Sequence, residues 1–291
     1  MVNKDTSFPK IRNIRTAEKL FDFSKPQIMG ILNLTPDSFY DGGKYQNEEQ
    51  WVSQTRKMLE DGADIIDMGA VSTRPGAKPV DEDQELRRLL PPLKRLVVEF
   101  PKVVFSIDTY RARVARQCIE AGAQIINDIS GGNFDKNMFS TIADLKVPYV
   151  LMHIHGTPEN MQLHPISENI VSVVRTFFEK KVAALQALGV EDIILDPGFG
   201  FGKTLESNYE LLQNMAATRI GNLPLLAGIS RKSMINKVLN VQPSKALNGT
   251  TVVNTLALLH GANLLRVHDV KEAREAIDIV HFYQNAGRFP K

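Results

Sequence analysis

The chain has 291 residues, 43% of them hydrophobic and 23% charged, so it can bury a core for one large domain or two ordinary ones. Thirty-five Lys and Arg against 33 Asp and Glu give a formal net charge of +2, which argues against a polyanion or nucleic-acid binder. With one cysteine, no signal-type segment and no long apolar run, we expect a soluble, cytoplasmic protein that does not enter a membrane.

The chain begins without regular alternation and then becomes strongly periodic. Residues 1–27 form an extension, in which residues 11–23 are expected to make a small hairpin that covers the bottom of the fold. From residue 28 onward, short apolar runs rich in β-forming residues alternate with stretches of helical periodicity. The eight runs are 28–33, 64–69, 103–108, 124–128, 148–153, 192–196, 224–230 and 263–268. Their nearly continuous hydrophobicity is typical of parallel strands buried on both faces.

The segments between the runs predict amphipathic helices. Asn47 and Gln50 have the spacing of a capping box and predict a helix start, and the acidic run 81–85 predicts the solvated first turn of another helix. Leu188-Gly189 predicts the end of a longer helix. Eight strand and helix units in this length favour a single-domain α/β protein, a (β/α)₈ TIM barrel over residues 28–291.

In such a barrel the active site lies where the strands end and the following loops begin. The residues that close the runs are Asn33, Asp67, Asp108, Asn127 with Asp128, His153, Asp196, residues 230–232, and Arg266 with His268. Any single Asp or Asn at such a position commonly caps the next helix. The whole set instead predicts a small-molecule site with an anion-binding part and a part that reads an amidine-like edge.

The anion-binding part is expected to contain Arg74, which precedes Pro75 and Gly76, together with Arg266 and His268. Arginine forks match phosphate oxygens, and glycine allows close backbone approach. The alternative for Arg266 is a structural ion pair with Asp269 or Asp196.

Two further motifs have weaker functional interpretations. Residues 196–204 resemble a phosphate-binding loop, but Pro197 stands where that motif requires glycine, so we reject nucleotide binding there. His153 and His155 have the spacing of a metal pair. No third ligand follows at a suitable spacing, which favours structural or substrate-adjacent histidines.

The strand-end motifs together resemble those of bacterial dihydropteroate synthases, in the same order, from about residue 28 to residue 268. The matching segments are 31–39 with 41–43, 72–76, 107–109, 126–128, 196–203, 230–233 and 266–269. The resemblance implies a (β/α)₈ barrel and a Mg²⁺-requiring transferase of folate synthesis that is a sulfonamide target. That reaction joins 6-hydroxymethyl-7,8-dihydropterin pyrophosphate to p-aminobenzoate and releases pyrophosphate. One departure is Gly69-Ala70-Val71, where the family usually has Gly-Gly-Glu.

The pterin edge carries N–H groups that suit acceptors, so Asp108, Asn127 and Asp196 are expected to read it, with Lys232 donating to the ring. The resemblance further implies that Arg266 packs over the pterin. The other implied roles are pyrophosphate binding by Asn33, Arg74, Arg266 and His268, Mg²⁺ contact by Asn33, stabilisation of a cationic pterin by Asp37, and p-aminobenzoate binding by Phe39, Thr73, Pro75, Phe201 and Ser233.

Three other functions remain as alternatives: a pterin-binding methyltransferase, a Schiff-base aldolase that uses Lys232 covalently, and a silent paralogue. The family also implies a homodimer through the last helices. Apolar residues there could equally belong to the core, which is the default interpretation of a helical stripe. They are Val252, Leu256, Leu259, Ile277, Ile279 and Val280.

Overall fold

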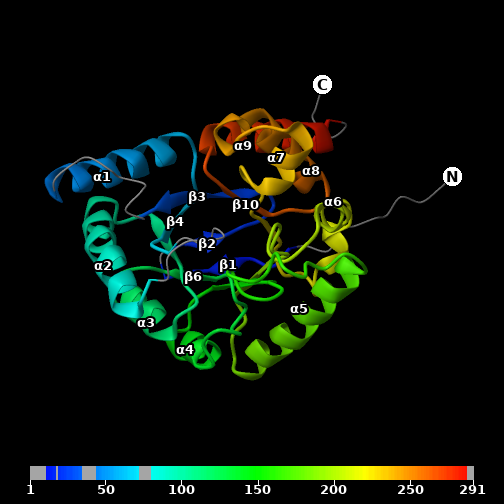
Figure 1. The fold of residues 1–291 in the computed structure, drawn as a ribbon. Coiled ribbons are helices and arrows are strands. Elements are labelled where there is room, and N and C mark those ends of the chain that lie inside the picture. The colour runs from blue at the N-terminus through cyan, green and yellow to red at the C-terminus, as the bar shows by residue number, and fades with distance from the viewer. Residues whose placement is uncertain (1–10, 18, 35–43, 72–79, 287–291) are drawn as a thin grey trace.

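The computed structural model describes residues 11–17, 19–34, 44–71 and 80–286, with eight parallel strands in the order β8-β7-β6-β5-β4-β3-β10-β9 (Figure 1). A single bridge between Leu195 and Leu225 joins the two ends of this sheet, so the barrel is nearly closed. The strands are β3 (Gln27–Asn33), β4 (Ile65–Gly69), β5 (Val104–Asp108), β6 (Ile125–Asp128), β7 (Tyr149–Met152), β8 (Ile193–Asp196), β9 (Leu226–Ala227) and β10 (Leu264–Val267). The predicted (β/α)₈ TIM barrel is confirmed.

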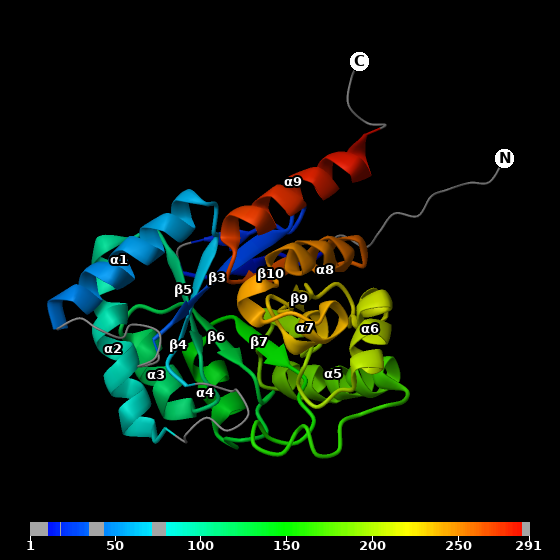
Figure 2. The same ribbon diagram turned by 45° about the horizontal axis from the view of Figure 1, so that its top comes forward.

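Helices separate the strands and cover the outside of the barrel (Figures 1 and 2). They are α1 (Lys44–Glu60), α2 (Glu82–Glu99), α3 (Ala112–Glu120), α4 (Met138–Leu145), α5 (Ile170–Ala187), α6 (Leu205–Gln213), α7 (Ser233–Leu239), α8 (Leu247–Leu259) and α9 (Val270–Asn285), with short 3₁₀ turns η2 (Met215–Thr218) and η3 (Pro243–Lys245). No helix in the described ranges is both long and apolar enough to span a membrane.

The barrel interior is built in layers because alternate strand residues face inward. Its lower layer is apolar and includes Ile65, Val104 and Ile194. A hairpin of β1 (Ile14–Arg15) and β2 (Leu20–Phe21) pairs antiparallel, and Ile14, Phe21 and Phe23 pack into this same cluster. The hairpin therefore contacts the barrel on the side opposite the carboxyl ends of the strands.

Three local predictions were wrong or incomplete. The run 224–230 contains only the two-residue strand β9, and α1 already begins at Lys44, so Asn47 lies within that helix rather than at its N-cap. Asp81 does cap α2, where its side chain accepts from the Gln84 amide at 2.7 Å. Glu85 in the same acidic run is 1% exposed rather than solvated, because it pairs with Arg111.

The last helices divide into a buried and an exposed apolar stripe. Ile277 and Val280 are core residues, as the default interpretation predicted. Val252, Leu256 and Leu259 on α8 and Ile279 on α9 are exposed, so that interpretation is wrong for them. Figure 2 shows α8 and α9 side by side along one flank of the barrel. The predicted end of α5 is confirmed, with Gly189 at φ +82° just beyond the helix.

Candidate active site

Side chains from three strands meet at Arg266. This residue of β10 donates from Nε to Oδ2 of Asp67 on β4 and from Nη2 to Oδ2 of Asp108 on β5, each at 2.6 Å. Burial lowers the pKa of Arg266, but the two carboxylates more than offset this and hold it above its ordinary value. Its ion-pair partners are therefore Asp67 and Asp108 rather than Asp269 or Asp196, which the alternative interpretation named, and Asp269 pairs instead with Arg231.

Asp67 also connects Arg266 to a fourth strand, β6. Its Oδ2 accepts a second hydrogen bond, from Nδ2 of Asn127 on β6, at 3.1 Å. The other oxygen, Oδ1, has no hydrogen-bond partner among the described residues, although Asp67 is 0% exposed. One buried carboxylate thus holds a guanidinium and an amide that the sequence assigned to the pterin.

The carboxyl group of Asp108 has a raised pKa. Burial raises its pKa to about 7, Arg266 opposes the shift, and the negative charges of Asp67, Glu85 and Asp128 add to it. The carboxyl group therefore exchanges its proton near neutral pH, unlike an exposed aspartate.

A second acid and base lie on the opposite side of the mouth. Asp196, at the end of β8, is 4% exposed and its Oδ1 accepts from the Gly198 amide at 2.8 Å. Lys232 donates to the Phe199 carbonyl at 2.6 Å, and its Nζ lies 4.6 Å from the centroid of the Phe201 ring. Burial lowers the pKa of Lys232 to about 8, against the attraction of Asp196. The charge of Arg266 also lowers the pKa of Lys232, and the charge of Asp108 raises it. The charged groups on the two sides of the mouth therefore influence one another.

The loop after β8 owes its shape to Lys203 and glycine. The buried Lys203 side chain donates from Nζ to the carbonyls of Gly198 at 2.7 Å, Phe201 at 3.1 Å and His153 at 3.4 Å, and burial lowers its pKa to about 7. Gly198 has φ +69°, and a Cβ there would approach the His153 carbonyl oxygen to 1.9 Å. The loop is therefore closed around its own lysine.

Two polar strand ends have structural roles. The Asp128 carboxylate accepts from the amides of Ser130 and Gly132 and from the Tyr149 hydroxyl, which fixes the loop after β6. The His153 ring packs edge-on against Phe177, and burial lowers its pKa to about 2. Within the described residues no three His, Cys, Asp or Glu side chains gather as a metal site.

The anion-binding part is described only in part. Asn33 is half-buried at the end of β3, and the His268 ring lies 3.1 Å from the Ser230 hydroxyl through Nδ1. Ser233 is exposed at the first position of α7. The remaining predicted residues, Asp37, Phe39, Thr73, Arg74 and Pro75, lie outside the described residues.

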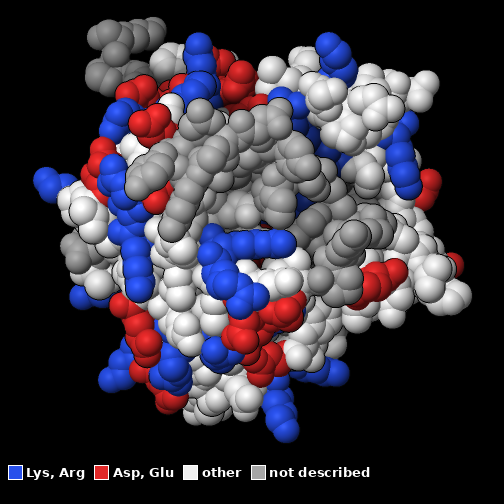
Figure 3. All heavy atoms as spheres, turned by 60° about the vertical axis from the view of Figure 1, so that its left-hand side comes forward, with Lys and Arg blue, Asp and Glu red and all other residues white. Residues whose placement is uncertain are grey.

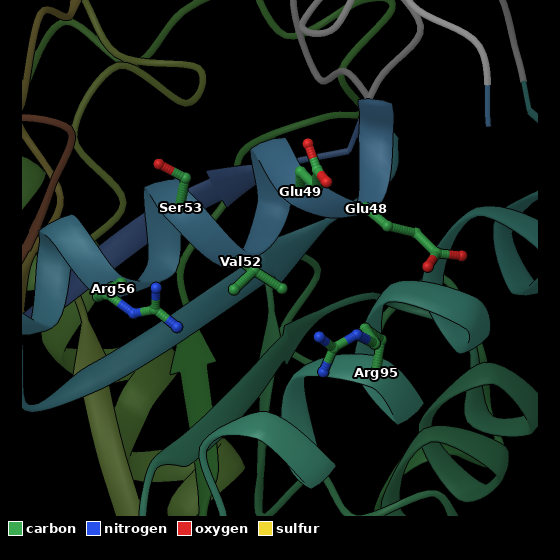
Figure 4. Close-up of a pocket in the computed structure, with 6 residues that line it drawn as sticks. All are labelled: Glu48, Glu49, Val52, Ser53, Arg56 and Arg95. Atoms are coloured by element: carbon green, nitrogen blue, oxygen red, sulfur yellow. The ribbon is translucent and has the colours of Figure 1, made fainter. Parts of the chain in front are cut away.

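A separate surface groove of about 390 Å³ lies on the outer helix layer, between α1 and α2 (Figure 4). Its basic residues, Arg56 and Arg95, both pair with Glu99, at 2.8 and 2.9 Å. Figure 3 shows basic and acidic side chains lying next to one another on this side of the molecule. The groove is outside the barrel, and both of its arginines are already paired with a carboxylate.

Sequence reasoning missed two residues of this region. Asp67 was placed at the end of its strand and received no role, but it is the middle residue of β4. Lys203 entered as part of a failed phosphate-binding motif and of the family resemblance, also without a role. The signal for Asp67 is its spacing, because Ile65, two residues earlier, faces the barrel interior and Asp67 must do the same.

Comparisons with known proteins give a consistent picture. The model of the family described as pterin binding enzyme matches residues 29–268. Dihydropteroate synthase of Escherichia coli K12 is 42% identical over 261 residues, which is 89% of this chain and 92% of that protein. The structure of Yersinia pestis dihydropteroate synthase with a sulfonamide drug has a TM-score of 0.88 at 40% identity, covering 94% of this chain and all of the other (100%). Xanthomonas albilineans dihydropteroate synthase in complex with 7,8-dihydropteroate has a TM-score of 0.84 at 33% identity, covering 96% and 100%.

Proposed function

This chain belongs to the pterin-binding enzymes, among the dihydropteroate synthases, and we propose that its barrel mouth joins 6-hydroxymethyl-7,8-dihydropterin pyrophosphate to p-aminobenzoate. It is a transferase of folate synthesis that forms 7,8-dihydropteroate, releases pyrophosphate and is a target of sulfonamides. The observation that carries this function is the convergence of carboxylates, an amide, a lysine and an arginine at one barrel mouth.

We assign recognition of the pterin to the residues around Arg266. The 2-amino-4-oxopyrimidine edge offers several N–H donors, which Asp196, Asn127 and ionised Asp108 can accept. Lys232, held against the Phe199 carbonyl, can donate to the ring oxygen or nitrogen. Arg266 supplies a flat cation for the face of the ring, a contact that guanidinium groups favour.

The pyrophosphate is assigned to Asn33, Arg74, Arg266 and His268. A single half-buried amide, with no carboxylate cage among the described residues, suits a metal held mainly by phosphate oxygens, and we therefore propose Mg²⁺ with Asn33 as its protein contact. When bound, Mg²⁺ neutralises charge on the pyrophosphate.

The reaction breaks the bond between the pterin methylene carbon and the pyrophosphate oxygen, and the bonding pair leaves with pyrophosphate. Arg74 and His268 stabilise the leaving group, and Asp37 stabilises the positive charge that the electron-rich pterin shares. The aryl nitrogen of p-aminobenzoate then bonds to the methylene carbon and releases a proton to water. The unprotonated aryl amine needs no strong base. Its binding site is assigned to Phe39, Thr73, Pro75, Phe201 and Ser233.

We further propose that the protein acts in the cytoplasm as a homodimer. Its one cysteine, Cys118, is a free buried thiol, which supports a reducing compartment. Exposed apolar side chains on α8 and α9 support a self-complementary interface through these helices.

The decisive test is turnover. Purified protein with Mg²⁺ should release pyrophosphate only when both the pterin pyrophosphate and p-aminobenzoate are present. Release without the amine, or none at all, would contradict the synthase function. If borohydride fails to trap a carbonyl substrate on Lys232, the protein is not a Schiff-base aldolase.

A further inference from the structure

Asp67 lies one layer beneath the residues assigned to the pterin. On β4 it is paired in register with Ser106 of β5, one inward position below Asp108. It is 0% exposed, whereas the side chains of Arg266 and Asp108 above it are 19% and 18% exposed. A molecule that enters through the mouth therefore meets Arg266 and Asp108 before it can reach Asp67.

We propose that Asp67 is a positioning residue of the pterin site, which holds Arg266 and Asn127 in their substrate-facing orientations without touching the substrate. This inference rests on the proposed synthase function. It follows from one shared atom, Oδ2, which accepts from Arg266 Nε at 2.6 Å and from Asn127 Nδ2 at 3.1 Å.

The chemistry of a carboxylate explains why aspartate stands at this position. A carboxylate can only accept hydrogen bonds, so Asn127 must turn its NH₂ group toward Asp67. The amide oxygen of Asn127 then remains to accept an N–H from the pterin. An asparagine at position 67 would offer both donor and acceptor, and it would leave either orientation of Asn127 open.

The Asp67 carboxylate also helps to fix the orientation of the Arg266 guanidinium. Asp67 binds Nε and Asp108 binds Nη2, so the guanidinium plane is fixed at two points by charge-assisted hydrogen bonds. Without the charge of Asp67, Asp108 becomes the main counter-ion and the guanidinium can rotate toward it. Arg266 would then leave the position from which it covers the ring.

The test compares Asp67→Asn with Asp64→Asn in the full-length protein. Asp64 lies three residues earlier, at the opposite end of the barrel, and it also binds an arginine, Arg274, at 2.6 Å. Both changes remove one charge from a paired carboxylate. Only D67N should weaken binding of the pterin pyrophosphate, measured by calorimetry, by about tenfold or more. The KM for p-aminobenzoate at saturating pterin should stay within about twofold, a split that general loss of structure would not give.

A double-mutant cycle identifies the route of the effect. If Asp67 acts through Arg266, then D67N adds little to the loss caused by Arg266→Lys, because the neighbouring changes are coupled. Independent, multiplicative losses would overturn the proposal, as would wild-type pterin affinity in D67N. Asp67→Ser repeats the test if D67N does not fold. A wild-type protein that binds no pterin pyrophosphate would instead refute the synthase function itself, so the two failures are distinguishable.

Discussion

Two groups assigned to the pterin, Asp108 and Lys232, titrate near neutral pH and give the activity a defined pH range. The pKa of Asp108 is about 7 and that of Lys232 about 8, whereas His153, with a pKa of about 2, stays neutral throughout. Ionised Asp108 accepts from the pterin and protonated Lys232 donates to it. We therefore predict a bell-shaped profile of kcat/KM for the pterin substrate, rising through about pH 7 and falling above about pH 8.

The variant Lys232→Arg tests whether deprotonation of Lys232 causes the alkaline limb of the pH profile. A guanidinium does not deprotonate below about pH 12, so this limb should disappear while the acid limb stays. An unchanged alkaline limb in K232R would show that another group causes it.

Asp108 also affects stability, with a sign that follows from its raised pKa. Between its ordinary value of 3.8 and about 7, the folded protein binds a proton that the unfolded chain releases. This contribution is present at low pH and is lost as the pH rises through about 7. The free energy of unfolding of Asp108→Asn, measured with denaturant, should therefore fall less with rising pH over this range than that of the wild type. Parallel curves would contradict the assignment.

Gly228 keeps open the space in which the pterin ring is expected to lie. A Cβ there would come to 3.7 Å from Asp196 Oδ2 and 3.9 Å from Arg266 Cβ, which are ordinary contacts. Gly228→Ala should therefore keep its Tm but weaken pterin binding by about tenfold, because the methyl group takes ligand volume. A fall in Tm without a change in affinity would show that the glycine serves packing instead.

The polar residues at the carboxyl end of the barrel could be predicted because each stands at the end of an apolar run. Asp108, Asn127, Asp196 and Arg266 were all assigned in this way, and the structure brings them to one mouth. Asp67 escaped assignment because its layer depends on how β4 and β5 are staggered. A single sequence carries the period of a strand but not its register.

At the scale of elements, the loop after β8 is a unit that Lys203 holds together. Lys203→Met would leave three carbonyls without their donor, at a cost of about 2 kcal/mol or more. The loop carries Phe201, so we predict a higher KM for p-aminobenzoate and a smaller change for the pterin. Tm and the two KM values measure this, and equal increases in both KM values would argue against a local effect.

Gly189 and Gly198 both have a positive φ, but only at Gly198 would an added methyl group also collide with a neighbouring atom. A methyl group added at Gly189, with φ +82°, would have nothing within 4 Å, whereas one added at Gly198 would meet the His153 carbonyl oxygen at 1.9 Å. Gly189→Ala should lower the free energy of unfolding by about 1 kcal/mol because of backbone strain alone. Gly198→Ala should lower it by a further ~1–3 kcal/mol, or prevent folding, because of the added collision. Equal losses in denaturant unfolding would contradict the close approach.

Element boundaries followed the sequence only where local chemistry decides them. The glycine that ends α5 acts over one turn and was predicted correctly, and the acidic run 81–85 correctly marked the start of α2, although Asp81 was not identified as its cap. The run 224–230 is apolar throughout most of its length, but only Leu226 and Ala227 pair with β10. Residues 228–230 leave the sheet to approach the site, where Ser230 meets His268. The length of β9 is therefore set by tertiary contacts, and nothing in the local sequence indicates where its pairing ends.

At the scale of the whole molecule, the two ends of the barrel have opposite characters. The lower end is closed by apolar contacts with the β1–β2 hairpin, and the upper layers hold the buried charges. The ionic layer rests on an apolar one that excludes water from below, which strengthens its interactions. Substrate access is thereby confined to the mouth at the carboxyl ends of the strands.

The flank made by α8 and α9 is the surface on which we expect a second copy to bind. Val252, Leu256 and Leu259 follow a helical spacing on α8, and on α9 Ile279 is 70% exposed. In a two-fold interface one substitution changes both partners, so a charge introduced there meets its own copy. We therefore predict that Leu256→Asp and Ile279→Lys dissociate the dimer.

Sedimentation equilibrium of the wild type, L256D, I279K and the control Val98→Asp tests this prediction. Val98 is a 77% exposed residue of α2, away from the α8–α9 flank, so V98D adds the same charge as L256D outside the proposed interface. The wild type and V98D should remain dimeric, while dimer affinity in the other two falls by at least about tenfold, the effect of about 1.4 kcal/mol. Because the substituted side chains are exposed, each monomer should keep its Tm within a few degrees. A monomeric wild type, or L256D and I279K as dimeric as V98D, would place the exposed stripe outside any self-association, and its apolar side chains would then need a different partner.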